Sequence, residues 1–420
     1  MLIISIIIAV IFLGILVFLH EYAHFIIAKK SGIKVPIFSI GFGPPIYKKQ
    51  VGETEYRICA IPFGGYVKLS GMEPNELKGE DYEFYSKKPL IRILVLIGGP
   101  FANIFTGFLI YLFVIWFAGI DTPRTTMVEP TSKSVFEKGD KILELNNETI
   151  KDWFDIEKYT QDSNTVVIKR GTERKKLRVS KSVMDSLLPL FPPVIGGVEK
   201  EGPAYKLGLN KGDTILSING RNIHYWEDMR SIISSSPGES LIITYKSRGE
   251  IKKGVIIPTK TKMMQGDSII TIGIIGVLTP FKSKRISLPS SLKFASLQFV
   301  DTSTKIFRVF GLLARRKVSP RELGGPLSIV YLTKKSLNWG WKNLFFFLAY
   351  ITINLGIINL IPIPPLDGSH ALLGLIEMIT RKKPNQKWLN SLEAIGFFIL
   401  IFIMLYVTMN DILRFLFHNV

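Results

Sequence analysis

Four long apolar stretches dominate the pattern of hydrophobic and polar residues along this chain. They cover residues 2–28, 93–120, 343–366 and 394–409. A helix of about 20 apolar residues is long enough to cross a bilayer, and residues 412–417 extend the last and shortest stretch. The pattern therefore predicts a polytopic α-helical membrane protein with four transmembrane helices.

The polar segment between the second and third apolar stretches contains an internal repeat. Residues 139–147 read Gly-Asp-Lys-Ile-Leu-Glu-Leu-Asn-Asn, and residues 212–220 read Gly-Asp-Thr-Ile-Leu-Ser-Ile-Asn-Gly, at an offset of 73 residues. A tryptophan follows each copy at the same distance, as Trp153 and Trp226. Alternating apolar residues before Asn-Asn or Asn-Gly indicate strands joined by a tight hairpin. We therefore expect two inserted copies of one mostly β module with short helices.

The distribution of charged residues predicts how the four spans are oriented in the membrane. The net charge is +19, but no nucleic-acid-binding motif accompanies it, so we expect no nucleic-acid partner. Lysine and arginine crowd the two short connections between spans, which the positive-inside rule assigns to the cytoplasm. Both termini and residues 121–342 then face outward. The basic residues are Lys29, Lys30, Lys48, Lys49, Lys68, Lys87, Lys88 and Arg92 in the first connection and Arg381, Lys382, Lys383 and Lys387 in the second.

Two features of composition narrow the possibilities further. Cys59 is the only cysteine, which excludes an intrachain disulfide framework and a thiolate zinc cluster. The first apolar stretch has no basic region before it and no small-residue cleavage site after it, so we expect it to remain as a membrane anchor rather than to be removed.

The sequence His20-Glu21-Tyr22-Ala23-His24 interrupts the first apolar stretch. Histidines four residues apart on a helix project from one face and can share a tetrahedral metal. The glutamate beside the first histidine can take a proton from a metal-bound water. Ionisable groups at membrane depth are costly and usually functional. We therefore expect a metal site in the membrane, although a core cluster of satisfied polar groups remains the alternative.

A third ligand is expected where the third apolar stretch ends. Residues 359–368 carry three prolines that break the helix, followed by Asp367. Broken backbone at this depth must be enclosed by protein or line a wet cavity, and an aspartate there can complete a two-histidine, one-carboxylate site. His370 remains a reserve ligand. His224 in the outward segment and His418 at the C-terminus are poorer candidates.

At this point the chain resembles a known family. His20-Glu21-x-x-His24 and the sequence from Asn359 to Gly368 are similar to the paired motifs of the site-2 protease family of intramembrane zinc proteases. The four spans with two inserted modules resemble its bacterial regulator-of-sigma-E protease branch, and residues 208–220 resemble a PDZ domain. The resemblance implies one Zn²⁺ per chain held by His20, His24 and Asp367, with Glu21 as catalytic base. It also implies cleavage within the membrane, near the cytoplasmic side.

Further residues are expected to contact substrate. Residues 56–70 look like the family's membrane-associated β-hairpin, and strand-forming residues around Gly64-Gly65 predict an edge that can hold an unwound substrate, or else a purely structural hairpin. Asn103 and Asn359 are expected to orient substrate carbonyls or an oxyanion, or only to satisfy neighbouring backbone. In the second module Ile195, Gly196, Gly197 and Val198 resemble the approach to a peptide groove. A steric screen over the membrane site is the alternative role for both modules.

Residues 291–317 have apolar positions near helical spacing and a basic polar face, which predicts an amphipathic helix on the membrane surface or a plain packing helix. The expected segments are transmembrane helix 1–28, β-hairpin region 29–88, transmembrane helix 89–120, PDZ-like modules 121–190 and 191–262, membrane-surface linker 263–342, transmembrane helix 343–368, cytoplasmic loop 369–390 and transmembrane helix with C-terminus 391–420.

The leading expectation is an intramembrane zinc endopeptidase of a bacterial inner membrane. The resemblance implies that its substrates are single-span membrane proteins, such as anti-sigma factors or signal-peptide remnants, that an upstream extracytoplasmic protease has already trimmed. A PDZ-based membrane scaffold with a structural metal is one alternative. A metal or ion transporter is another, because intramembrane histidine and aspartate can mark an ion pathway.

Overall fold

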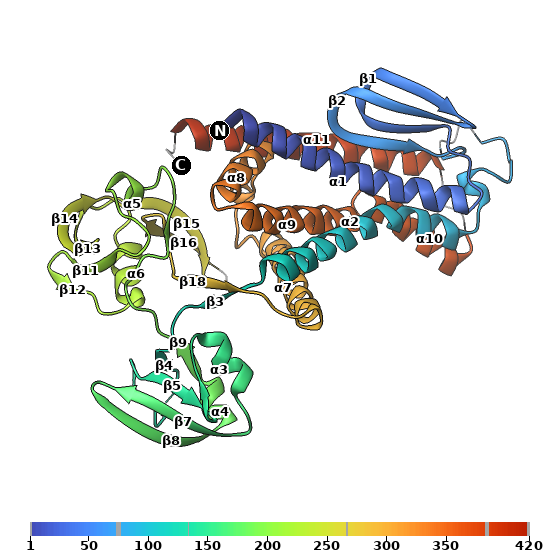
Figure 1. The fold of residues 1–420 in the computed structure, drawn as a ribbon. Coiled ribbons are helices and arrows are strands. Elements are labelled where there is room, and N and C mark those ends of the chain that lie inside the picture. Colours follow the sequence, from blue (N-terminus) through green and yellow to red (C-terminus); the bar gives the residue numbers. More distant parts are fainter. Residues whose placement is uncertain (1, 73–76, 133, 266–267, 383–385, 418–420) are drawn as a thin grey trace. The chain divides into compact units, whose positions relative to one another are not determined.

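The chain forms two compact units in a computed structural model that describes residues 2–72, 77–132, 134–265, 268–382 and 386–417. The first unit combines Met1–Phe117 with Ser287–Val420, and the second is Ala118–Ile286 (Figure 1). The division separates the apolar helices from the repeated β modules. His418 lies outside the described residues.

Four helices of the first unit are long and apolar enough to cross a membrane, among the residues that the structure describes. They are α1 (Leu2–Lys30), α2 (Pro89–Ala118), α9 (Trp341–Asn359) and α11 (Gln386–Phe417). The expected four spans are therefore confirmed in length and composition. The remaining helices are α7 (Leu288–Ala314), which falls on the expected amphipathic segment, α8 (Pro326–Asn338), α10 (Asp367–Thr380) and the 3-10 turns η2 (Phe84–Ser86) and η3 (Pro320–Glu322).

Strands β1 (Ile37–Val51) and β2 (Thr54–Lys68) form a long antiparallel hairpin that curls back on itself. Because of the curl, Phe38 pairs with Val67 on one side and with Tyr56 on the other. Residues 65–68 pair only with residues 37–40 among the described strands, so they form one end of this small sheet. Gly65 packs against α1, where an added Cβ would lie 3.3 Å from Glu21 Cγ.

The second unit contains the repeat seen in the sequence, as two four-stranded sheets with the same topology. Their strand orders are β6-β5-β7-β8 and β12-β11-β13-β14. The first two strands and the helix of each copy begin 73 residues apart, as in α3 (Trp153–Tyr159) and α6 (Trp226–Ser234), whereas the last two strands begin 78 and 77 residues apart. The strands are β5 (Lys141–Leu145), β6 (Glu148–Thr149), β7 (Ser163–Arg170) and β8 (Glu173–Ser180) in the first copy and β11 (Thr214–Ile218), β12 (Arg221–Asn222), β13 (Leu241–Ser247) and β14 (Glu250–Ile256) in the second.

Shorter elements complete the second unit, and each module has its own apolar core. They are β3 (Ile120–Pro123), β4 (Val128–Pro130), α4 (Lys181–Asp185), β9 (Leu187–Pro189), β10 (Gly197–Val198), α5 (Pro203–Lys206), β15 (Thr259–Gln265), β16 (Ser268–Ile274), β17 (Val277–Leu278) and β18 (Phe281–Lys284). Ile275 is buried in the second core, and β17 pairs with β10. The expected linker at 263–342 therefore begins too early, because the chain returns after residue 263 to complete the second module.

Close helix packing in the first unit sets the framework of the site. A Cβ at Gly107 of α2 would lie 2.4 Å from the Ile353 side chain of α9, and one at Gly356 of α9 would lie 2.7 Å from the Pro100 carbonyl of α2. Such distances require glycine, because real Cβ atoms do not come so close. Small residues of this kind let membrane helices approach closely, so α2 is held firmly against α9.

Candidate metal centre

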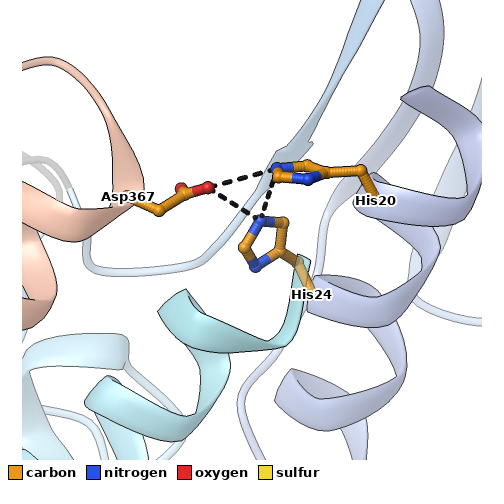
Figure 2. A group of neighbouring side chains, drawn as sticks. All are labelled: His20, His24 and Asp367. Atoms are coloured by element: carbon orange, nitrogen blue, oxygen red, sulfur yellow. Dashed lines mark hydrogen bonds and ion pairs between the residues drawn. The ribbon is translucent and has the colours of Figure 1, made fainter. Parts of the chain in front are cut away.

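His20 and His24 lie one turn apart on α1 and are both buried, with 7% and 8% of their surface exposed. Asp367 is the first residue of α10, directly after the turn that ends the third long helix, and it reaches both rings (Figure 2). Its Oδ2 lies 3.1 Å from His20 Nε2 and 3.4 Å from His24 Nε2, and the two Nε2 atoms are 3.1 Å apart. The structure therefore brings together all three ligands expected from the sequence.

The triangle of donor atoms matches what zinc requires. In a tetrahedral site with bonds of about 2.0–2.2 Å, neighbouring ligand atoms lie about 3.3–3.6 Å apart. The distances of 3.1, 3.1 and 3.4 Å between these donors are close to that spacing. Two imidazoles and one carboxylate are also a donor set of catalytic zinc sites that leave the fourth position open. The residues present thus fit a zinc ion.

Helix α2 forms one wall of this site. His24 Nδ1 lies 2.7 Å from the carbonyl oxygen of Val95. A carbonyl can only accept, so Nδ1 carries the proton and Nε2 keeps its lone pair for a metal. One turn later, a Cβ added to Gly99 would lie 2.2 Å from His24 Nε2 and 2.8 Å from His20 Nε2. Another turn on, the Asn103 side-chain amide nitrogen lies 3.2 Å from His20 Nδ1.

Glu21 lies next to His20 in sequence, partly buried, and faces the curled hairpin. Gly65 of β2 passes beside it, with an added Cβ 3.4 Å from Val17 and 3.3 Å from Glu21 Cγ. Gly64 has a positive φ of 105°, and a Cβ there would overlap the Phe42 ring at 2.1 Å. The expected Gly64-Gly65 pair therefore lets the strand run close to the carboxylate and to its own aromatic neighbour.

Several other predicted residues are not part of the donor triangle. Asn103 is fully buried (0% exposed) and its amide contacts His20; its expected contact with substrate stays a prediction. Asn359 lies in the last turn of α9, half-buried, and its side chain makes no hydrogen bond among the described residues. The reserve ligand His370 instead faces Glu393, with Nε2 and Oε1 3.6 Å apart. His224 belongs to the second unit.

The segment from Ile195 to Val198 is partly paired with neighbouring segments. Its backbone bonds to residues 212–213 on one side, through Ile195 N to Asp213 O and Gly212 N to Ile195 O. On the other side, Gly196 N donates to Leu278 O and β10 pairs with β17. Ile195 and Gly196 are therefore bonded to neighbouring segments, whereas the strand Gly197–Val198 pairs with β17 alone among the described strands. The expected groove at Ile195, Gly196, Gly197 and Val198 stays a prediction.

Sequence reasoning missed the roles of Val95 and Gly99. A backbone carbonyl has no residue-type signature, because any amino acid at position 95 supplies one. Gly99 belongs to the Gly98-Gly99-Pro100 sequence, whose small residues by themselves indicate only close packing between helices. Its four-residue spacing from Asn103 was the available signal that both lie on one helix face.

Comparison with known proteins places the whole chain in one family. The model of peptidase family M50 matches residues 8–403. The zinc metalloprotease RasP of Geobacillus kaustophilus is 29% identical, covering 98% of each chain, and RasP of Oceanobacillus iheyensis is 29% identical over 96% of this chain and 97% of its own. A Neisseria meningitidis protein that is named as a zinc metalloprotease is 29% identical over 96% and 97% of the two chains.

A solved PDZ domain from Listeria monocytogenes aligns with 21% of this chain and 88% of its own length, at 23% identity and a TM-score of 0.17. A TM-score this low leaves the PDZ assignment of the two modules a prediction. The family match is independent of that assignment, because it covers nearly the whole chain, including both motifs of the donor triangle. The chain belongs to peptidase family M50, the site-2 protease family, and is a zinc metalloprotease of that type.

Proposed function

We propose that this protein cleaves single-span membrane proteins within the bilayer, with His20, His24 and Asp367 as zinc ligands and Glu21 as catalytic base. The observation that supports this proposal most directly is the donor triangle. Three atoms from two elements 343 or more residues apart in sequence lie 3.1–3.4 Å from one another. The histidines belong to a helix apolar enough to span a membrane. A metal site at that depth has access to peptide bonds inside the membrane.

The chemistry divides between the metal and Glu21. Zinc at this site supplies Lewis-acid polarisation of the scissile carbonyl and makes a water more acidic. The Glu21 carboxylate takes the proton from the attacking water and delivers it to the leaving amine. The donor atoms His20 Nε2, His24 Nε2 and Asp367 Oδ2 all point to one place. Glu21 follows His20 directly on α1 and would act as the base towards a water that a zinc ion held by these three residues makes more acidic.

We further propose that the substrate binds in extended form along β2. A transmembrane helix must unwind before its peptide bonds can be attacked, and an extended segment needs hydrogen-bond partners for its backbone. Residues 65–68 are at one end of the small sheet and pass beside Glu21. Strand addition to this edge would satisfy the substrate backbone and carry it past the catalytic carboxylate. Asn359, the last residue of α9, has an amide that makes no hydrogen bond among the described residues, and it is the proposed additional contact for substrate.

The orientation is also a proposal. The concentration of lysine and arginine in the connections between spans favours a cytoplasmic-side active site in a bacterial inner membrane, with the two modules outside. The substrates we propose are anti-sigma factors or signal-peptide remnants that an extracytoplasmic protease has already shortened. The modules would then act either as PDZ domains that bind the exposed tail or as a size filter that excludes untrimmed proteins.

The test is to co-express a tagged, externally truncated single-span protein with the wild-type chain and with Glu21→Gln. The wild type should cleave the tagged protein inside its apolar segment, and Glu21→Gln should lose cleavage by roughly 10²- to 10⁴-fold while keeping one zinc per chain. His20→Ala should lose both. Equal cleavage by the wild type and Glu21→Gln would refute the role of Glu21 and favour a scaffold with a structural metal.

A further inference from the structure

One face of α2 touches both metal-binding histidines. Val95, Gly99 and Asn103 follow one another at four-residue spacing, so they lie on the same face of the helix. Val95 accepts a hydrogen bond from His24, Gly99 leaves room for both Nε2 atoms, and Asn103 contacts His20. The first of these contacts fixes which ring nitrogen of His24 is free. The contact between Asn103 and His20 decides in the same way which ring nitrogen of His20 is free.

Asn103 is placed unusually for an amide side chain. It is fully buried (0% exposed), and its only side-chain partner among the described residues is His20 Nδ1, 3.2 Å from Nδ2. The amide oxygen has no partner among those residues. Buried polar groups are normally hydrogen-bonded. Because Asn103 keeps only this one side-chain contact in an apolar interior, we attribute its position to the contact with His20.

The contact has two possible hydrogen-bond directions, and each corresponds to one tautomer of His20. With the amide nitrogen facing Nδ1, the ring accepts there and carries its proton on Nε2, which then donates to Asp367 Oδ2 at 3.1 Å. With the amide turned over, its oxygen accepts from Nδ1–H, and Nε2 has a free lone pair. Only the second state can bind a metal through Nε2. Turning an amide over exchanges two groups of nearly equal size.

We propose that Asn103 is a positioning residue that selects the metal-binding tautomer of His20, as the Val95 carbonyl does for His24. The inference rests on the proposed zinc site and adds a role for α2 in it. When His20 Nε2 is a ligand, the Asn103 oxygen accepts the Nδ1 proton and fixes the ring orientation. Without an acceptor at Nδ1, neutral His20 retains its proton on Nε2 through the hydrogen bond to Asp367. Zinc must then compete with that hydrogen bond.

The test measures zinc affinity of the purified full-length chain by competition with a chelator, for Asn103→Leu, Asn103→Asp and Thr352→Val. Leucine keeps the volume and removes the acceptor, so zinc should bind about 10- to 100-fold more weakly. Aspartate offers an oxygen in the same place and should keep affinity near wild type. Thr352 donates to the Asn103 backbone carbonyl at 3.3 Å without touching a histidine, so Thr352→Val controls for disturbed helix packing and should bind normally.

A second measurement does not depend on any variant folding. The chain has five histidines, so the ¹⁵N spectrum of histidine-labelled wild type is sparse enough to assign. Zinc-loaded protein should show His20 protonated at Nδ1 with that proton hydrogen-bonded. An unprotonated His20 Nδ1 in the zinc-loaded state would overturn the inference, and so would equal zinc affinity in Asn103→Leu and wild type, or an equal loss in Asn103→Asp and Asn103→Leu. Normal zinc binding by His20→Ala would instead refute the proposed zinc site itself.

Discussion

Replacing Gly99 by alanine should abolish zinc binding while leaving the helices folded. The added Cβ would lie 2.2 Å from His24 Nε2 and 2.8 Å from His20 Nε2, whereas ordinary contacts are 3.4–4 Å. At least one ring must therefore retreat by about 1 Å or more, when ligand distances in metal sites tolerate only about ±0.2 Å. His24 has little freedom to move, because its Nδ1 is held by the Val95 carbonyl at 2.7 Å.

Gly99→Ala is expected to lower both the stability of the fold and the rate of cleavage. Overpacking of this kind costs roughly 1–3 kcal/mol of stability, which a folded membrane protein can survive. Misplacement of catalytic groups by about 1 Å can reduce the rate ~100-fold, and loss of the metal would reduce it further. The assay is zinc content of the purified protein, with cleavage of a tagged single-span substrate as the second readout.

The neighbouring glycine provides a matched control. A Cβ at Gly98 would lie 2.4 Å from Ile27 Cδ1, the far end of a flexible side chain that can rotate away. Gly98→Ala should therefore keep its zinc and most of its activity, although its nominal overlap is similar. Full zinc occupancy in Gly99→Ala would refute the reasoning, since it would mean that α2 is not held against the rings. Equal zinc loss in both variants would point to general disruption of α2.

Three further predictions concern stability and are checked by thermal unfolding of the full chain. Burial alone would raise the pKa of Asp155, but the hydrogen bond from Lys284 holds that pKa below its usual range. Asp155 therefore stabilises the fold above its unfolded pKa of about 3.9, and this contribution is lost as the pH falls through the lower folded value. Lys284→Met should cost about 1.5–3 kcal/mol of stability at neutral pH and make the melting temperature fall less steeply as the pH is lowered. An unchanged fall in melting temperature at acidic pH would contradict this. Arg92 and Glu377 form a buried pair at 2.7 Å, so Glu377→Leu should cost about 3–5 kcal/mol, and Arg92→Met in the same chain should restore much of it. Asp411, fully buried, accepts from the backbone at the start of α8, so Asp411→Ala should cost about 0.5–2 kcal/mol; a wild-type melting temperature would show that this contact is dispensable.

The sequence predicted those features of the fold that follow from local patterns. Apolar stretches long enough to span a bilayer became α1, α2, α9 and α11. The 73-residue repeat became two sheets with the same strand order and a helix at the same position. In each case one stretch of chain carries the whole signal, because helix length and strand alternation are properties of consecutive residues.

Features that depend on pairing between segments distant in sequence were not predictable in the same way. Strand β17 comes back to pair with one side of β10, which moves the end of the second module beyond residue 263. The double pairing of Phe38 in the curled hairpin is similar. The β10–β17 pairing and the double pairing of Phe38 both join strands whose sequences alone are compatible with several partner strands.

The metal site shows the same division at the level of single atoms. Histidine and aspartate are found from sequence because their chemistry is unusual in an apolar helix, so His20, His24 and Asp367 were identified as candidates. A metal ligand also needs the correct ring nitrogen free, and that is decided by the partner of the other nitrogen. The partner of His24 is a backbone carbonyl, and access to both rings depends on a missing side chain at Gly99. Neither has a chemical signature. On the proposed ligand set, changes on α2 that leave His20, His24 and Asp367 in place are therefore expected to remove the metal. A chain with both motifs intact is then expected to need Gly99, Asn103 and the backbone carbonyl at position 95 as well.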